Sequence, residues 1–330
     1  MTHLFKSLAI PCSVAALLLT AMSAHAQSSV TISGLVDVGV YRGFDKTTQL
    51  GTIQRSNIAF NGVEDLGGGL AATFKLSHRF DLDTGLQEGV GAKPFWHGES
   101  TVGVKGAWGS VRLGRALDAV WANDWAYDPW YNFNRIASPA WQYWHYNYTS
   151  DRTSNNGSPE YGRLSNGVFY DSPSFGGFAF HLSGSFEDSI GPDGGTSNNL
   201  GLSLNYDKGP ISAMLAHSKN SSEDTVTFVG GKYTVGAWSV MGAYDRSKFE
   251  GAVDAIAKVY TVGTAYRLGA AEFKLGFGRL DASGAKSKFL GVGADYWLSK
   301  RTSVYVSAGR NNPSEGASTT AYGVGLAHSF

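Results

Sequence analysis

The residues best suited to binding a solute lie between positions 115 and 162. This stretch contains twelve aromatic side chains, and five of the nine tryptophans of the chain fall between Trp121 and Trp144. Aromatic faces stack on sugars and planar acids, whereas buried rings fix the packing of a loop, and others form girdles at subunit or membrane interfaces. All three uses remain open for the candidate stacking side chains, which are Trp121, Trp125, Trp130 and Tyr131.

Patterns for catalysis and metal binding are missing. The sequence has no Gly-x-Ser-x-Gly motif, no His-Glu-x-x-His motif and no histidine or cysteine pair at the spacing of metal ligands. Asp124 and Asp128 are the one acidic pair considered for glycoside cleavage, but a loop sequence does not reveal the separation that such carboxylates need. We therefore expect no enzyme activity, no metal and no cofactor.

Short alternating segments surround the aromatic stretch. Between residues 28 and 41, valine and isoleucine alternate with threonine, serine and aspartate, and residues 70–79 repeat the alternation with Lys75 and Arg79 on the polar face. The same pattern continues to the end of the chain, with glycine-rich tight turns and longer polar connections in alternation. Apolar side chains facing lipid and polar ones facing a lumen give a strand this period of two.

These segments predict an all-β fold, a 16-stranded antiparallel transmembrane β-barrel with short periplasmic turns and long external loops. A soluble sandwich is disfavoured, because it would not need a polar face on strand after strand. The aromatic stretch at 115–162 lacks the alternation, and we expect it to be a long third loop that folds into the lumen and narrows a water-filled pore. Closed backbone hydrogen bonding should stabilise such a barrel without a hydrophobic core.

The N-terminus has the pattern of a secretory signal. Residues 1–6 carry positive charge, residues 8–22 are apolar, and Ala24-His25-Ala26 supplies the small residues of a cleavage site. We predict removal of residues 1–26, which leaves residues 27–330 as one barrel domain and takes away the single cysteine, Cys12. The mature chain then has 26 basic and 27 acidic residues, a net charge of 26 − 27 = −1, which gives no support to nucleic-acid binding.

Six blocks of sequence also resemble one known family, the Gram-negative general porins, especially those of β-proteobacterial type. The blocks occur in the family's order, and they are 29–37 (SVTISGLVD), 62–70 (GVEDLGGGL), 109–115 (GSVRLGR), 170–178 (YDSPSFGGF), 298–305 (LSKRTSVY) and 327–330 (AHSF). The resemblance implies a homotrimer in the outer membrane that passes small hydrophilic solutes and ions. It also implies that the outer-membrane assembly machinery reads the terminal residue, Phe330.

The resemblance further implies a charged constriction. A basic wall would consist of Arg55 and Arg163, and Lys75, Arg79 and Arg112 share the inward parity that could reinforce it. Opposite them, the loop would present an acidic face made of Asp118, Asp124 and Asp128. A third basic position of the family is not matched, since the chain reads Trp96-His97-Gly98-Glu99 there, so the sequence leaves the sign of ion selectivity open. A pore whose aromatic loop binds sugars or aromatic carboxylates is the alternative function.

Overall fold

The computed structural model describes residues 28–89, 94–151, 162–186, 189–190, 196–250 and 255–330. The predicted signal at 1–26 lies outside these residues. Two short helices are present, the 3-10 helix η1 (Asp124–Tyr127) and α1 (Pro139–Tyr143). The strands are β1 (Ser29–Arg42), β2 (Thr48–Gly51), β3 (Ser56–Gly67), β4 (Leu70–Phe80), β5 (Glu99–Gly106), β6 (Gly109–Leu117), β7 (Arg163–Asp171), β8 (Phe178–Ser185), β9 (Ser189–Ile190), β10 (Thr196–Ser197), β11 (Leu200–Lys208), β12 (Ile211–Lys219), β13 (Thr225–Val235), β14 (Trp238–Lys248), β15 (Ile256–Leu268), β16 (Ala271–Ala282), β17 (Ala285–Trp297), β18 (Thr302–Pro313) and β19 (Thr319–Ser329).

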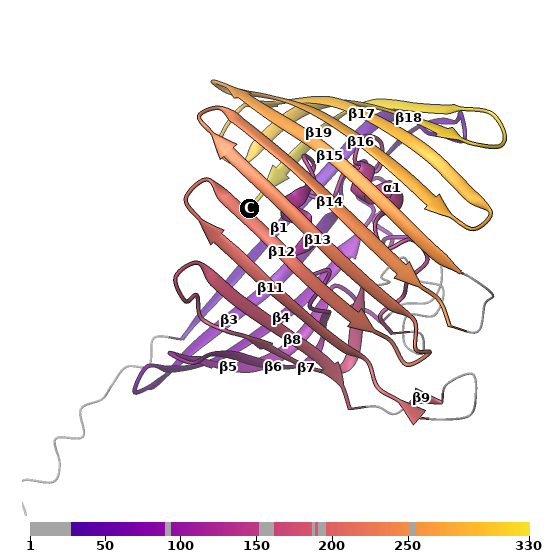
Figure 1. Ribbon diagram of the computed structural model, residues 1–330. Helices are drawn as coiled ribbons and strands as arrows, with labels where there is room; N and C mark the ends of the chain where they lie inside the picture. Colours follow the sequence, from indigo (N-terminus) through magenta and orange to yellow (C-terminus); the bar gives the residue numbers. More distant parts are fainter. Residues whose placement is uncertain (1–27, 90–93, 152–161, 187–188, 191–195, 251–254) are drawn as a thin grey trace, which may run out of the picture.

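One antiparallel sheet closes on itself to form a barrel with tilted strands (Figure 1). The sheet has 17 strands, of which β2 is only four residues long, so 17 − 1 = 16 strands build the wall. Closure occurs between β1 and β19, where Leu35 pairs with Ser329. The terminal Phe330 continues this ladder by exchanging two backbone hydrogen bonds of 3.1 Å with Gly34. The predicted 16-stranded antiparallel barrel is confirmed.

Side chains alternate across the wall as the sequence predicts. In β18, Val304 and Val306 point outward and are 37% and 52% exposed, whereas Tyr305 and Ser307 point inward and are 2% and 5% exposed. An apolar outer face suits contact with lipid, and backbone pairing around a closed ring leaves no sheet edge in that lipid. No described helix has the length and apolar character to cross a membrane.

The two ends of the barrel differ in their connections. At one end, two-residue turns join successive strands, as at Gly209-Pro210 and Gly269-Ala270. The other end carries most of the longer loops, although β16 and β17 are joined there by only Ser283 and Gly284. We assign the short turns to the periplasmic end and the loop-bearing end to the outside, following the usual asymmetry of these barrels.

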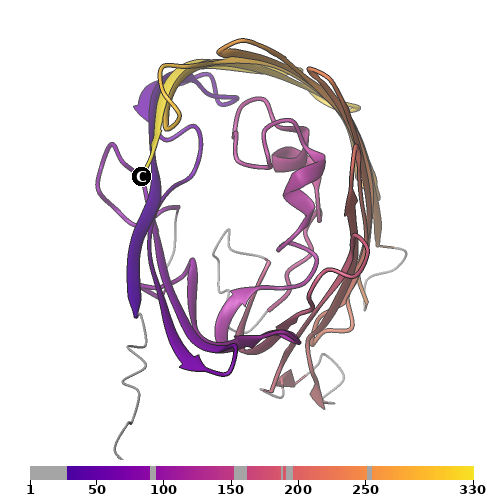
Figure 2. The same ribbon diagram turned by 90° about the vertical axis from the view of Figure 1, so that its left-hand side faces the viewer.

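The segment after β6 runs through the interior of the barrel (Figure 2). It begins at Asp118 rather than at Arg115, because β6 extends to Leu117. Side chains of this inner loop pack on inward-facing residues of the wall and form an apolar cluster that includes Val120, Tyr127, Trp144, Phe228 and Phe289. The expectation of a barrel without a hydrophobic core is therefore wrong. A loop that folds inward needs an apolar surface to rest on, and the inward face supplies one where the loop packs.

Candidate functional site

The inner loop rests on one side of the barrel and leaves the other side open. Helix α1 contacts β15, β16 and β17, and η1 contacts β13 and β14. Polar contacts hold the loop on the same part of the wall. Asn134 Nδ2 donates to Ser307 Oγ at 2.8 Å, and Trp144 Nε1 donates to Thr261 Oγ1 at 3.1 Å. In the view along the barrel, the inner loop lies close to the wall of β13 to β17 and away from β1 (Figure 2).

Two inward-facing glycines allow the loop backbone to approach the wall. A Cβ atom at Gly291 of β17 would collide with the carbonyl oxygen of Ala137, and one at Gly309 of β18 would collide with that of Ile136. Side chains at these positions would push the loop into the lumen. Glycine is therefore required at these two positions for the loop backbone to pack on the strands.

A buried histidine joins the loop to the wall. His145 Nε2 lies 2.7 Å from Asp124 Oδ2 in η1, and its Nδ1 lies 2.6 Å from Asp245 Oδ2 in β14. Burial favours the neutral imidazole, but the negative charges of Asp245 and Asp124 outweigh it and raise the pKa of His145 to about 10. The imidazolium therefore links two carboxylates from segments far apart in the sequence. Trp121 covers it, with ring centroids 4.1 Å apart.

The three aspartates expected to form an acidic face do not reach the lumen. Asp118, Asp124 and Asp128 are each 1% exposed. Asp118 accepts hydrogen bonds from the backbone of Val120 at 2.8 Å and from Ser150 Oγ at 2.5 Å, and Asp128 accepts from Trp130 N and Ser138 Oγ, both at 2.9 Å.

The three carboxylates therefore do not form the predicted acidic face. They fix turns inside the loop, where backbone N–H groups without other partners need acceptors. Burial raises the pKa values of all three against the opposing effect of their hydrogen bonds.

Three residues of the predicted basic wall border one cavity. Arg55, Arg79 and Arg163 border a cavity of about 390 Å³, together with Lys75 and Glu99. Arg163 is the most enclosed, at 3% exposed, and its Nε donates to the carbonyl oxygen of Gly98 at 2.5 Å.

The other two expected basic residues, Lys75 and Arg112, are ion-paired with acids of the wall. Lys75 and Arg112 lie 2.9 Å and 2.7 Å from the oxygens of Glu99, and Arg112 also lies 3.1 Å from Asp171. Their charges are largely compensated by these two acids.

One glutamate stands among three arginines. Glu88 Oε1 lies 2.5 Å from Arg135 Nη2 and 3.3 Å from Arg55 Nε, and its Oε2 lies 3.8 Å from Arg79 Nη1. Burial alone would raise the pKa of Glu88, but the guanidinium charges of Arg55, Arg79 and Arg135 hold it well below its usual range. Asp81 Oδ1 also lies 3.7 Å from Arg135 Nη2. We call Arg55, Arg79, Arg135, Glu88 and Asp81 the arginine cluster, whose formal charge is +3 − 2 = +1.

An aromatic ring of the inner loop closes this cluster. The guanidinium carbons of Arg55 and Arg135 lie 5.0 Å and 5.6 Å from the ring centroid of Trp141. Such cation–π contacts hold planar guanidinium groups in place while they stay charged. The inner loop therefore brings an arginine and a tryptophan to the basic wall.

Sequence reasoning missed Glu88, Arg135 and Trp141. Arg135 is the only arginine of the described part of the inner loop, and its presence on an expected inward loop was a usable signal. It supplies the third cation that the Trp96–Glu99 segment lacks. Nothing in the pattern around Glu88 indicates its place, because it follows β4 in an irregular connection.

The four candidate stacking residues divide into two pairs. Trp121 stacks on Tyr148 at 5.6 Å, and Trp130 is 5% exposed and lies against Gly293 of the wall. Trp125 and Tyr131 are 45% and 42% exposed, with ring centroids 5.8 Å apart. Trp121 and Trp130 therefore pack the loop against its surroundings, whereas Trp125 and Tyr131 have exposed rings. Among the described residues, no group of three acidic, histidine or cysteine side chains could hold a metal ion.

Comparisons with known proteins agree with this geometry. A family model described as Gram-negative porin matches residues 13–316. Outer membrane porin protein 32 of Delftia acidovorans is 32% identical over 66% of this chain, and the match spans 60% of that relative. Major outer membrane protein P.IB of Neisseria meningitidis serogroup B is 27% identical over 96% of this chain and 99% of its own length.

A solved structure of similar shape is the anion-selective porin from Comamonas acidovorans. Its TM-score is 0.78 at 27% identity, covering 92% of this chain and all of that one. OmpT of Vibrio cholerae with loop L8 deleted has the same fold, with a TM-score of 0.67 at 14% identity over 92% of this chain and 99% of that one.

Proposed function

Because the chain belongs to the Gram-negative porin family, whose members are outer-membrane channels for passive diffusion, we propose that its pore prefers small anionic solutes. The observation that carries this proposal is the arginine cluster beside the inner loop. Three guanidinium groups there face two carboxylates, Glu88 and Asp81. Asp118, Asp124 and Asp128 of the inner loop are buried and accept hydrogen bonds from other partners.

The field across the lumen follows from this imbalance. Arg163 borders the same cavity as Arg55 and Arg79, so the charge on this wall is +4 − 2 = +2 when Arg135, Glu88 and Asp81 are included. Charges that line a narrow pore with low-dielectric walls raise the local concentration of ions of opposite sign. An anion crossing here gains attraction, and a cation meets repulsion.

The chemical form of the cluster favours carboxylate and phosphate groups. Arginine keeps its charge at every physiological pH and offers forked N–H donors that match two oxygens at once. Trp141 holds Arg55 and Arg135 with their planes near its ring. A relative of similar shape is named an anion-selective porin, which supports the same direction of selectivity for this chain.

The assembly of the channel is part of the proposal. We infer that residues 1–26 are removed on export, that residues 27–330 form the barrel, and that three copies assemble. Phe330, which ends the closing ladder beside Gly34, would serve as the signal for the outer-membrane assembly machinery. No catalytic role is proposed for the barrel, whose partners are outer-membrane lipid, ions and small hydrophilic solutes.

A planar-bilayer experiment tests the selectivity. The protein is refolded, inserted into a neutral bilayer and held in a potassium chloride gradient, where the zero-current potential gives the ratio of chloride to potassium permeability. The proposal expects a potential of the sign that chloride produces, and an anion preference that weakens as salt screens the cluster. A potential set by potassium would refute anion preference while leaving the porin assignment intact.

A further inference from the structure

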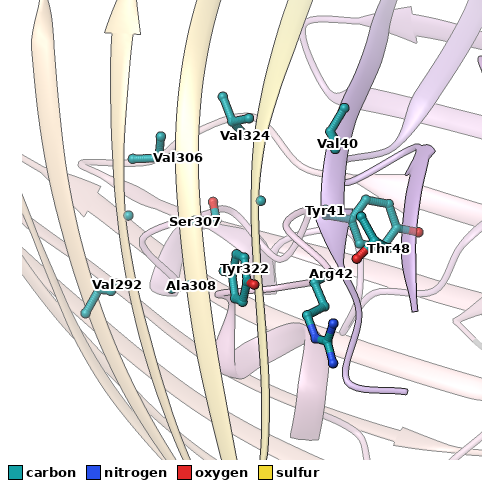
Figure 3. A pocket seen from close by; sticks show the side chains of 12 residues that line it. Val40, Tyr41, Arg42, Thr48, Val292, Val306, Ser307, Ala308, Tyr322 and Val324 are labelled. Carbon is teal, nitrogen blue, oxygen red and sulfur yellow. The ribbon is translucent and has the colours of Figure 1, made fainter. Parts of the chain in front are cut away.

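Two hollows lie along the strands that close the barrel, one on each face of the wall. The outer hollow is lined by β1, β2 and β17 to β19, and Val40, Val324 and Val306 stand in a row across three of these strands (Figure 3). It faces the membrane, so a solute inside the pore does not reach it. The inner hollow, which we call the vestibule cavity, has a volume of about 200 Å³ and lies in the lumen.

Two parts of the chain form the vestibule cavity. The tip of the inner loop contributes Trp130, Tyr131 and Phe133. The wall contributes inward-facing residues next to the short turns, among them Arg267, Glu272, Lys274, Asp295, Trp297 and Arg301. Because those turns mark the periplasmic end, the vestibule cavity lies on the periplasmic side of the inner loop.

The vestibule cavity adjoins the cavity of the basic wall. Leu35 and Phe133 line both of them. A solute that has passed Arg55 and Arg79 therefore meets the vestibule cavity next on its way to the periplasm.

Two cations of the vestibule cavity have no acid bound to them. Arg267 and Arg301 are exposed, and neither makes an ion pair within the described part of the chain. Glu272 pairs in register with Arg267, but its Oε2 lies 3.2 Å from Lys274 Nζ instead, and Asp295 also contacts Lys274. The cavity has a formal charge of +3 − 2 = +1. The uncompensated positive charge is therefore on the two arginines.

Aromatic rings supply apolar surface to the same cavity. Tyr131 and Phe133 are 42% and 37% exposed, and Trp297 is half-buried. Most other rings of the inner loop pack on the wall, so these rings keep faces or edges that another ring can contact.

The backbone at the loop tip is held in an unusual conformation. Tyr131 and Asn132 have left-handed φ angles of 55° and 58°. Asp128 Oδ2 fixes this turn by accepting from Trp130 N at 2.9 Å and from Asn132 N at 3.1 Å. A bulky residue such as tyrosine rarely adopts this conformation. Strained positions of this kind persist where the surroundings enforce them, and they cluster at ligand sites.

The indole of Trp130 adds a hydrogen-bond donor without an acceptor. Trp130 is 5% exposed, and its Nε1 has no hydrogen-bond partner among the described residues. A Cβ atom at Gly293 would lie 3.1 Å from this nitrogen, and Gly293 pairs in register with Lys274. The donor therefore lies beside the charged residues of the vestibule cavity. Buried donors normally have a partner, and an oxygen of a bound solute would supply one.

From these charges and rings we propose that the vestibule cavity is a second solute site, separate from the arginine cluster, that binds a carboxylate attached to a single aromatic ring. The carboxylate would lie on Arg267 and Arg301, whose forked donors match two oxygens. The ring would lie against Tyr131 and Phe133. The volume is below the roughly 300–1,000 Å³ of sites for drug-sized ligands, which suits one ring with one acid group.

Two successive sites also suit conduction. A solute must bind well enough to enter a pore and weakly enough to leave it, and passage between neighbouring sites meets both needs. The second site does not depend on the anion preference of the arginine cluster, because its own arginines supply the charge.

Titration of single-channel currents with three small solutes tests this site. The refolded full barrel is placed in a bilayer, and interruptions of its current give the affinity of each solute. Benzoate has both the ring and the charge, acetate lacks the ring, and benzamide lacks the charge. Wild type should bind benzoate about tenfold more tightly than acetate or benzamide. Equal affinities for the three solutes overturn the proposal.

Variants then locate the binding. Arg267→Gln with Arg301→Gln should weaken benzoate binding about fivefold. The matched control, Lys105→Gln with Lys208→Gln, removes two exposed cations near the same end that do not line the cavity, and it should bind benzoate as wild type does. Tyr131→Asn removes the ring and keeps a residue that tolerates left-handed backbone. It should lower the ratio of benzoate to acetate affinity about threefold.

An unchanged double-arginine variant, or an equal loss in the control, contradicts the proposed site. Loss of benzoate binding in Arg55→Gln together with full binding in the double-arginine variant would assign the solute to the arginine cluster instead. An open-channel current without solute verifies that each variant folds. The zero-current potential of the same channels reports anion preference separately, so either proposal can fail while the other holds.

Discussion

Replacing Glu88 with glutamine removes the acid that contacts all three arginines of the arginine cluster and keeps its shape. The carboxylate lies within 4 Å of Arg55, Arg79 and Arg135, and the lowered pKa of Glu88 keeps it ionised at neutral pH. The formal charge of the cluster therefore rises from +1 to +2 in Glu88→Gln. We expect stronger anion selectivity.

Coulomb's law gives the size of this change. Two unit charges about 5 Å apart in water-like surroundings interact by about 332/(80 × 5), or roughly 0.8 kcal/mol. Removing one negative charge makes an anion at that distance more favourable by this amount and a cation less favourable. Each effect is about fourfold in local concentration, so the ratio of anion to cation permeability rises by up to about 16-fold at low salt. Screening reduces the change at high salt.

The assay is the zero-current potential across a bilayer in a salt gradient at two ionic strengths. Glu64→Gln is the control, because Glu64 is exposed on β3 near the periplasmic turn and takes no part in the cluster. The potential of Glu88→Gln should move toward the chloride limit, and more so at low salt. An unchanged potential, or a shift toward potassium, would refute the placement of this cluster on the ion path.

Other variants and a pH series test the remaining contacts. Arg55→Gln should shift the zero-current potential toward potassium, and Arg163→Gln, whose side chain is almost fully buried, should shift it less; the reverse order would contradict the described wall. His145→Gln breaks a buried ion pair and should lower barrel stability by about 3 kcal/mol, measured as the midpoint of thermal unfolding, whereas His217→Gln on the outer face should have little effect. The raised pKa of His145 means that this stabilisation is complete below about pH 6.5 and is lost as the pH rises through about 10. The difference between wild type and His145→Gln should therefore persist at pH 7 and vanish near pH 11, and a difference that disappears by pH 8 would rule out the imidazolium.

The barrel could be predicted from the sequence because its governing rule is local. A strand between lipid and water alternates with a period of two, so residues such as Val304, Tyr305 and Val306 reveal their faces without knowledge of the rest of the chain. Lys75 and Arg79, which share the predicted inward parity, border one cavity, and Arg112 pairs with Glu99. Parity does not give depth or pairing, and the compensation of Lys75 and Arg112 by Glu99 depends on the register of three strands.

The directions of the aspartate side chains in the inner loop could not be predicted, because a carboxylate on such a loop can have either of two opposite roles. An aspartate on a pore-facing loop can stay in water and attract cations, or it can accept N–H groups that an irregular backbone leaves without partners. In Asp118-Ala119-Val120 and Asp128-Pro129-Trp130 the carboxylate accepts from the N–H two residues ahead, at 2.8 and 2.9 Å. This is a local turn that favours aspartate wherever the chain must bend. Each aspartate that fixes such a turn is a negative charge that does not face the lumen. The conformation of the inner loop and the positive field of the pore therefore have a common origin, because the acids that shape the loop are withdrawn from the water that the arginines face.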